Sequence, residues 1–144
     1  MKDIFELTIN ADGKNEAFAR ATVAAFSLAL SPTLEEIGDL KTATSEAVTN
    51  AVVHAYGENG GKIKITGEAD TSDNSITVTV QDFGCGIEDL KSALEPFYTT
   101  KPDEERSGMG FTIIDTFSDE MSVESTVNVG TTVRFKKVFK NAES

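Results

Sequence analysis

Cysteine, proline and basic residues are all scarce in this sequence. Its 144 residues contain one Cys, one His, three Pro, and 13 Lys and Arg against 24 Asp and Glu, for a net charge of −11. One cysteine cannot form an internal disulfide, and one Cys with one His cannot build a zinc site. This usage fits a reducing, cytoplasmic compartment. Both halves of the chain are acidic, which argues against direct nucleic-acid binding and favours a basic protein partner.

Long hydrophobic runs are also missing. The most apolar run, residues 19–30, is interrupted by Arg20 and Ser27 and is shorter than the about 20 residues that span a bilayer. Acidic residues within 1–6 occupy the place where a signal peptide would be apolar. No proline-rich linker divides the chain. We therefore expect one domain over residues 1–144, with no targeting segment and no membrane association.

Hydrophobic periodicity predicts five strands and three long helices. The strands are expected near residues 5–9, 62–68, 76–80, 121–127 and 131–139, and the helices over 14–30, 34–56 and 111–118, with a loop-rich segment at 82–110. Thr33, three residues before Glu36, resembles a capping box for the second helix. Helices grouped beside a mainly antiparallel mixed sheet make an α+β protein, a two-layer α/β sandwich.

The first helix has apolar residues on two sides. One side carries Val23, Phe26 and Leu30. The other side carries a stripe formed by Ala17, Ala21, Ala24 and Leu28. Such a helix is either wedged in the core or covers a partner, and the pattern leaves both open.

Three polar clusters are candidates for chemistry. Glu46, Asn50 and His54 follow one another at helical spacing, so a carboxylate and an amide one turn apart could act as general base and cation ligand. The alternative is a solvated helix face. The segment 82–86, Asp-Phe-Gly-Cys-Gly, follows a strand and could bring backbone and carboxylate close to a ligand, or be an ordinary glycine turn.

The third cluster combines Thr99, Thr100 and Lys101 with the segment 107–110, Ser-Gly-Met-Gly, before a helix. Glycines at a helix start expose N–H groups that suit phosphate. The chain has neither a Walker A pattern nor a dinucleotide-binding fingerprint, so any nucleotide site must be of another kind.

The combination is more specific than its parts. Glu46-x3-Asn50, Asp82-x-Gly84-x-Gly86 and Gly108-x-Gly110, in this order, resemble the GHKL ATPase superfamily, whose Bergerat fold is an α/β sandwich. NEAFARATVAAF at 15–26, SEAVTNAVVHAY at 45–56, VQDFGCGI at 80–87 and the segment 96–114 resemble, more narrowly, the sporulation anti-sigma-F factors of Bacillus-type bacteria.

The resemblance implies a function. Members of that family bind ATP and ADP with Mg²⁺, inhibit a sporulation sigma factor, phosphorylate a serine of an anti-anti-sigma factor, and form homodimers. The chain is therefore expected to be an ATP-dependent protein-serine kinase that regulates transcription without touching DNA. The alternative is a nucleotide-gated anti-sigma binding module without significant kinase turnover.

The resemblance also assigns roles to residues. Glu46 would be the general base, Asn50 would hold Mg²⁺, and Asp82 would accept a hydrogen bond from the adenine amino group. Arg20 would contact a partner, although an exposed solubilising arginine is equally compatible, and His54 would lie near the nucleotide or be structural. The remaining nucleotide contacts would come from Gly84 and Gly86 in the loop, Ile87 at the base, Thr99, Thr100 and Ser107 in a lid, the N–H groups of Gly108, Met109, Gly110 and Phe111 at the phosphates, and Thr131 near the adenine through water.

Overall fold

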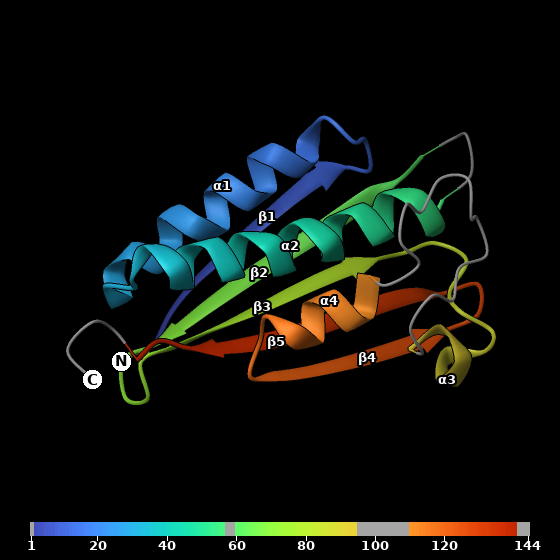
Figure 1. Ribbon diagram of the computed structural model, residues 1–144. Helices are drawn as coiled ribbons and strands as arrows, with labels where there is room; N and C mark the ends of the chain where they lie inside the picture. The colour runs from blue at the N-terminus through green and yellow to red at the C-terminus, as the bar shows by residue number, and fades with distance from the viewer. Residues whose placement is uncertain (1, 57–59, 95–109, 141–144) are drawn as a thin grey trace.

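The fold is an antiparallel sheet with helices on one face (Figure 1). The computed structural model describes residues 2–56, 60–94 and 110–140. The strands are β1 (Lys2–Asn10), β2 (Lys62–Asp70), β3 (Ser75–Asp82), β4 (Glu120–Thr126) and β5 (Gly130–Val138). The helices are α1 (Asn15–Ser27), the 3₁₀ turn η1 (Leu28–Leu30), α2 (Leu34–His54), α3 (Leu90–Ala93) and α4 (Gly110–Thr116).

The sheet has the strand order β1-β2-β3-β5-β4. The predicted two-layer α/β sandwich is confirmed. Every strand pair described is antiparallel, so the sheet is more uniform than the mainly antiparallel mixed sheet that was expected. Short turns join β2 to β3 and β4 to β5, and such turns reverse the chain and favour antiparallel pairing.

Helix α2 lies across the sheet and buries a stripe of small residues against it (Figure 1). The stripe consists of the buried residues Leu40, Ala43, Ala47, Ala51 and Ala55, and the half-buried Ile37 continues it toward the start of the helix. Alanines let the helix approach the buried branched and aromatic residues of the sheet, such as Ile65, Val78 and Phe135. Each of those three side chains contributes about 1.5–3 kcal/mol when fully buried.

The start of α2 confirms the predicted capping box. The backbone N–H of Glu36 donates to Thr33 Oγ1 over 3.1 Å, and that of Thr33 donates to Glu36 Oε1 over 2.9 Å. The other Glu36 carboxylate oxygen accepts from the Lys140 N–H at 2.7 Å, which ties the helix start to the residues after β5. Within the described ranges, no helix combines the length and apolar character needed to cross a bilayer.

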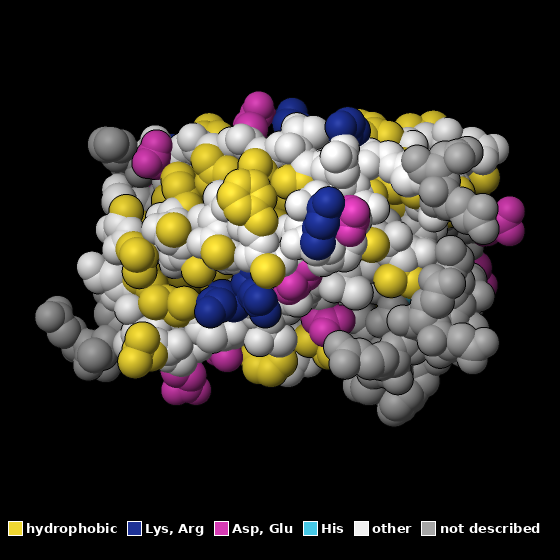
Figure 2. Space-filling view, turned by 90° about the horizontal axis from the view of Figure 1, so that it is seen from above, with side chains coloured by type: hydrophobic (Ala, Val, Ile, Leu, Met, Phe, Trp, Pro, Cys, Tyr) yellow, Lys and Arg dark blue, Asp and Glu magenta, His cyan; other side chains and the backbone are white. Residues whose placement is uncertain are grey.

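Helix α1 divides its two apolar sides between core and surface. Val23 and Leu30 are buried, and Phe26 packs edge-on against Phe5 with ring centroids 4.8 Å apart. On the outer side, Phe18 is 55% exposed and Leu28 59% exposed. Figure 2 shows apolar side chains gathered on this side of the molecule. The outer stripe is therefore surface, and only the inner side belongs to the core.

A short helix lies in the described part of the segment that was expected to be loop. Residues 90–93 form α3, whose N-cap Asp89 accepts from the Ser92 N–H at 3.1 Å. The sequence pattern missed it because four residues are too few to show helical periodicity. The next predicted helix, 111–118, is confirmed as α4 with slightly different ends.

Candidate functional site

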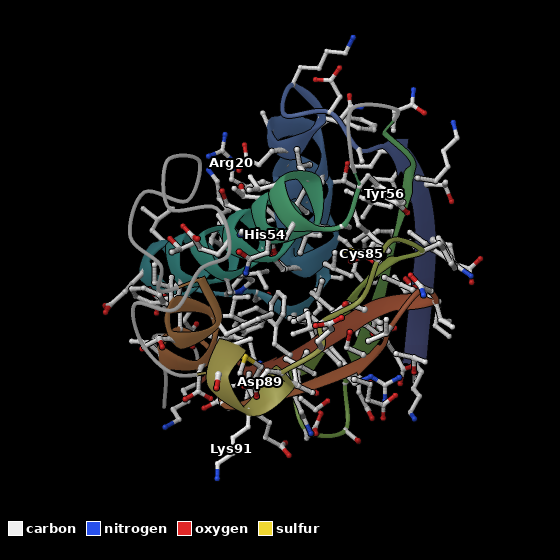
Figure 3. All side chains as sticks on the ribbon, turned by 90° about the vertical axis from the view of Figure 1, so that its right-hand side faces the viewer. Arg20, His54, Tyr56, Cys85, Asp89 and Lys91 are labelled. Atoms are coloured by element: carbon white, nitrogen blue, oxygen red, sulfur yellow. The ribbon has the colours of Figure 1, made fainter. Side chains whose placement is uncertain are left out.

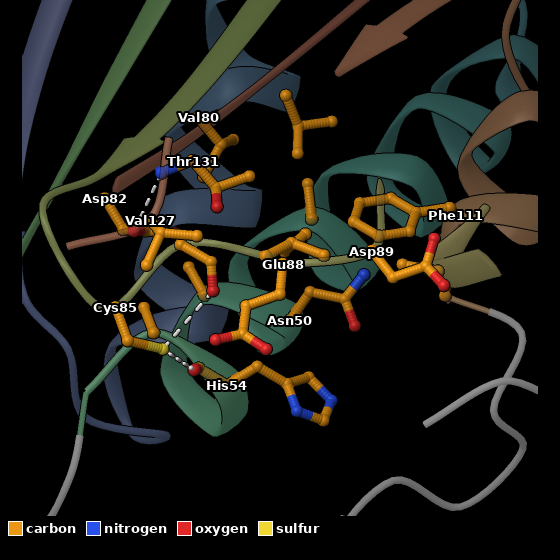
Figure 4. A pocket seen from close by; sticks show the side chains of 18 of the residues that line it. Asn50, His54, Val80, Asp82, Cys85, Glu88, Asp89, Phe111, Val127 and Thr131 are labelled. Atoms are coloured by element: carbon orange, nitrogen blue, oxygen red, sulfur yellow. Dashed lines mark hydrogen bonds between the residues drawn. The ribbon is translucent and has the colours of Figure 1, made fainter. Parts of the chain in front are cut away.

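A cavity of about 420 Å³ lies between the end of α2, the loop after β3 and the start of α4. That volume is within the range of small-molecule sites. Figure 3 looks onto this end of the molecule, with His54 on α2 and Asp89 beside α3. Figure 4 shows Asn50, Asp82, Phe111 and Thr131 around the cavity. The lining residues that were predicted from the sequence are Asn50, His54, Asp82, Gly86, Ile87, Gly110, Phe111 and Thr131.

Asp82, the last residue of β3, places a buried carboxylate in the cavity wall. It is only 7% exposed, and its Oδ1 accepts hydrogen bonds from the N–H groups of Gly84 at 3.0 Å and Thr131 at 3.1 Å. Burial raises the pKa of this carboxyl group above its usual value, because desolvation of the charge outweighs the two N–H donors. Since Oδ1 carries both donors, Oδ2 remains the acceptor for a ligand in the cavity.

The loop after Asp82 is clamped against the end of α2. The Cys85 N–H donates to the Ala55 carbonyl at 2.9 Å, and a Cβ on Gly84 would lie 1.9 Å from that same oxygen. Gly86, with φ +75°, lies against the turn between β4 and β5, where the Asn128 N–H donates to the Cys85 carbonyl at 2.8 Å. Gly84 thus shapes the loop without lining the cavity.

Tyr56 holds the same loop from the other side. Its hydroxyl donates to the Lys62 carbonyl at 2.5 Å and accepts from the Phe83 N–H at 2.8 Å. The Tyr56 ring also covers Gly61, where a Cβ would lie 2.3 Å from the ring. Tyr56 ends the family-like segment 45–56, but its role could not be predicted from the sequence, because its partners are backbone groups from other segments.

Asn50 faces the cavity with an unpaired amide. Its Nδ2 is buried and has no hydrogen-bond partner in the part of the chain that the structure describes. The first residue of α4 packs against it closely enough that a Cβ on Gly110 would be 2.4 Å from Nδ2. Buried polar atoms are seldom left without partners, so the orphaned amide indicates a ligand. The side-chain oxygen of Asn50 is also a suitable ligand for Mg²⁺.

Glu46 lies outside the cavity lining. It borders a second, shallower depression of about 280 Å³ together with Arg20, Lys41 and Ser45. Glu46 and Asn50 are one helical turn apart on the same side of α2, but only Asn50 borders the cavity. Arg20, from α1, pairs with Glu16 at 3.7 Å. The two depressions follow one another along α2, because the lining of the second ends at Glu46 and that of the cavity begins at Ala47.

Some predicted site residues cannot be placed. Thr99, Thr100, Ser107, Gly108 and Met109 lie outside the described residues. His54 lines the cavity, and its carbonyl is 3.3 Å from Cys85 Sγ. Further lining residues that the sequence analysis did not select include Cys85, Glu88, Asp89, Val127 and Asn128.

Comparisons with known proteins agree with this geometry. The family model for the histidine kinase-like ATPase domain matches residues 9–137. The anti-sigma F factor of Clostridium novyi is 53% identical over 131 residues, covering 90% of each chain. That of Bacillus subtilis is 47% identical over 138 residues, covering 95% of this chain and 93% of its own.

The fold also recurs in a solved structure. The RsbU and RsbW domains of Rv1364c from Mycobacterium tuberculosis superpose with a TM-score of 0.69 at 18% identity, covering 95% of this chain and 32% of that one. At 18% identity, the match shows a shared fold and nothing about function. The same helix-covered sheet therefore occurs in distant sequences.

Proposed function

The chain belongs to the anti-sigma F factor family and carries a histidine kinase-like ATPase domain, and we propose that it inhibits a sporulation sigma factor and phosphorylates a serine of an anti-anti-sigma partner with Mg-ATP. It acts in the cytoplasm on these protein partners. The observation that carries the proposal is the buried Asp82 carboxylate in the cavity wall, held by two backbone N–H groups so that one oxygen faces a ligand.

An adenine base matches that wall. Its amino group donates, and Oδ2 of Asp82 accepts, while Ile87, Val127 and Val133 supply apolar surface for the ring. A charge-assisted hydrogen bond in a desolvated site contributes about 1.5–3 kcal/mol. The base would therefore lie at the end of β3, with the phosphates directed toward Asn50 and the start of α4.

Asn50 is the residue that would hold Mg²⁺. Its side-chain oxygen would ligate the metal together with phosphate oxygens and water, and the buried, unpartnered Nδ2 would donate to a phosphate oxygen. When bound, the metal neutralises phosphate charge for transfer. Neutralisation of the phosphate charge is needed here because the protein is acidic and Glu88 and Asp89 also border the cavity. The segment that ends at Gly110 and Phe111 would supply backbone N–H groups to the phosphates.

Glu46 would receive the proton from the attacking serine hydroxyl. Its position, one turn before Asn50 and outside the cavity lining, suits a base that meets a protein substrate at the edge of the nucleotide site. Arg20 and Lys41 border the same depression and would contact an acidic segment of a partner. The substrate would therefore approach over α1 and the middle of α2.

The exposed apolar side of α1 supports a protein-contact role. Phe18 and Leu28 lie on it, and Leu34, at the start of α2, is 89% exposed. We propose that protein partners, including the second chain of a homodimer, cover this surface, because a monomer gains nothing from exposing three large apolar side chains.

Phosphate transfer tests the kinase assignment. Labelled ATP, Mg²⁺ and a purified anti-anti-sigma protein should yield phosphoserine, and Glu46→Gln should slow transfer by about 10²–10⁴-fold while ADP affinity stays unchanged. Glu35→Gln, at an exposed position in the first turn of α2, is the matched control and should transfer normally. Normal transfer by Glu46→Gln would remove Glu46 from the reaction.

The position of Glu46 outside the cavity also favours a second candidate function. In this alternative, the chain is a nucleotide-gated module whose ATP state regulates sigma affinity without significant transfer. Sigma binding that differs between ATP and ADP, with no phosphoserine formed, would select this alternative over the kinase.

A further inference from the structure

The Tyr56 hydroxyl links two backbone groups that belong to different segments. It donates to the Lys62 carbonyl at 2.5 Å and accepts from the Phe83 N–H at 2.8 Å. A carbonyl can only accept and an N–H can only donate, so the partners fix the direction of both hydrogen bonds. Tyr56 is half-buried at the same end of the molecule as the cavity (Figure 3), but it is not among the described residues that line it. Any effect of Tyr56 on a ligand is therefore transmitted through the backbone.

The register of β2 and β3 shows which contact the hydroxyl replaces. The last pair of the two strands is Ile63 with Asp82. One step further, Lys62 would stand opposite Phe83. The Gly61 carbonyl accepts from the residue after β1 at 2.8 Å, so the Lys62 carbonyl points the other way, toward β3. The tyrosine hydroxyl thus lies where a direct N–H to carbonyl bond would extend the ladder, and β3 ends at this point.

The chain that follows this interruption forms part of the cavity wall. The Cys85 N–H donates to the Ala55 carbonyl at 2.9 Å, and Cys85, Gly86 and Ile87 line the cavity. Ala55 and Tyr56 are consecutive residues after α2. The loop is therefore held to the end of α2 at two points, by the carbonyl of one residue and by the hydroxyl of the next.

We propose that Tyr56 is a positioning residue of the nucleotide site, whose hydroxyl stops the β2–β3 ladder and so directs the following loop onto the end of α2. This inference rests on the proposed nucleotide site. Without the hydroxyl, the Phe83 N–H can bond the Lys62 carbonyl directly, which lengthens the ladder by one pair and draws the loop away from Ala55. The protein then keeps its core but loses the shape of the cavity wall.

The first test titrates ADP into Tyr56→Phe, which lacks only the hydroxyl. ADP affinity should fall by about tenfold, because the loop no longer has its bound shape before the ligand arrives. The urea midpoint should stay within about 1 M of wild type, because the two freed backbone groups can bond each other or water. Thr116→Ala, whose lost hydroxyl donates to the Thr112 carbonyl inside α4, is the matched control and should bind ADP normally. A lower urea midpoint with unchanged ADP affinity would assign Tyr56 a merely structural role.

The second test follows the loop without any nucleotide. Cys85 is the only cysteine of the chain and is exposed, so iodoacetamide alkylates a single thiol, which displaces iodide. Its Sγ lies 3.3 Å from the His54 carbonyl at the end of α2. In Tyr56→Phe this contact should open, and alkylation should be several-fold faster than in wild type. Equal alkylation rates would show that the hydroxyl does not hold the loop.

Gly61 gives independent access to the same contact. A Cβ there would lie 2.3 Å from the Tyr56 ring, so Gly61→Ala must displace the ring and its hydroxyl. This change should lower ADP affinity by about tenfold in the wild-type background but by less than about twofold in Tyr56→Phe. Equal losses in both backgrounds, or wild-type ADP affinity in Tyr56→Phe, would overturn the inference. Absence of ADP binding by wild-type protein would instead refute the nucleotide site, and the alkylation rates would still report on the loop.

Discussion

The backbone N–H of Thr131 donates to Oδ1 of Asp82 over 3.1 Å, joining β5 to the end of β3 across 49 positions of sequence. This bond makes the orientation of the carboxylate depend on the pairing of two strands at the centre of the sheet. It also explains how the fold retains a buried acid. The cost of desolvating Asp82 is only partly offset by backbone donors, so the ionised carboxylate destabilises the fold that holds it.

Asp82→Asn should stabilise the protein at neutral pH. The pKa of Asp82 is raised on folding, so the ionised side chain is a penalty that is fully present above the folded pKa and is relieved as the pH falls through it. Asparagine keeps the oxygen that accepts from Gly84 and Thr131 but has no charge. Urea unfolding at pH 7 should show the variant to be more stable, and the difference should shrink as the pH approaches 3.8. A less stable variant at pH 7 would contradict the assigned pKa direction.

Gly84→Ala should disrupt the cavity. Its Cβ would lie 1.9 Å from the Ala55 carbonyl oxygen, so the loop must move away from the end of α2. We expect a loss of about 1–3 kcal/mol in unfolding free energy and a clear loss of ADP affinity. Gly13→Ala, where a Cβ meets nothing within 4 Å, is the control and should change stability by less than about 0.5 kcal/mol. Equal behaviour of the two variants would argue against the clamped loop.

Thr33→Ala should destabilise the protein by about 1 kcal/mol, because it removes the side-chain acceptor for the Glu36 N–H at the start of α2. Thr42→Ala, on the same helix, is the control for the cap, because the Thr42 hydroxyl donates to the Gly38 carbonyl within the helix and caps nothing. Thermal or urea unfolding measures both variants. A similar decrease in unfolding free energy in both variants would show that the capping box contributes no more than a hydroxyl inside the helix.

Asn50→Ala should abolish the contribution of Mg²⁺ to ATP affinity. Wild-type protein is expected to bind ATP about tenfold or more tightly with Mg²⁺ than with a chelator present, because Asn50 supplies the protein oxygen. The variant should show the same affinity in both conditions. Asn15→Ala on α1, whose amide bonds the Asn10 carbonyl, should behave as wild type. Retained Mg²⁺ dependence in Asn50→Ala would assign the metal to other residues.

Local patterns predicted much of the fold. The capping box needs only Thr33 and Glu36 at a separation of three residues. Both of its hydrogen bonds are present in the structure. Strand alternation in 62–68 and 76–80 also survives, because one face of the sheet must be buried against α2. These features are decided by neighbours in sequence, so a single sequence is enough to find them.

Features that depend on distant segments escaped prediction. Ser125 contacts Ile87 and Thr131, and Tyr56 contacts the backbone of Lys62 and Phe83. Helical spacing grouped Glu46 with Asn50 and His54, but the cavity extends only along the second of these turns, so Glu46 borders the neighbouring depression. Such relationships exist only after the sheet and helices have packed.

The most direct measurement is a calorimetric titration of ADP into wild-type protein and into Asp82→Asn. The wild type should bind one ADP per chain, and the affinity of the variant should be lower by about 10–100-fold, because its new amide donor faces the adenine amino group. Since the variant is expected to be folded and stable at pH 7, its weaker binding would come from the lost acceptor alone. Absence of binding by the wild type, or equal affinity in the two proteins, would contradict the assignment of this cavity as an adenine-nucleotide site.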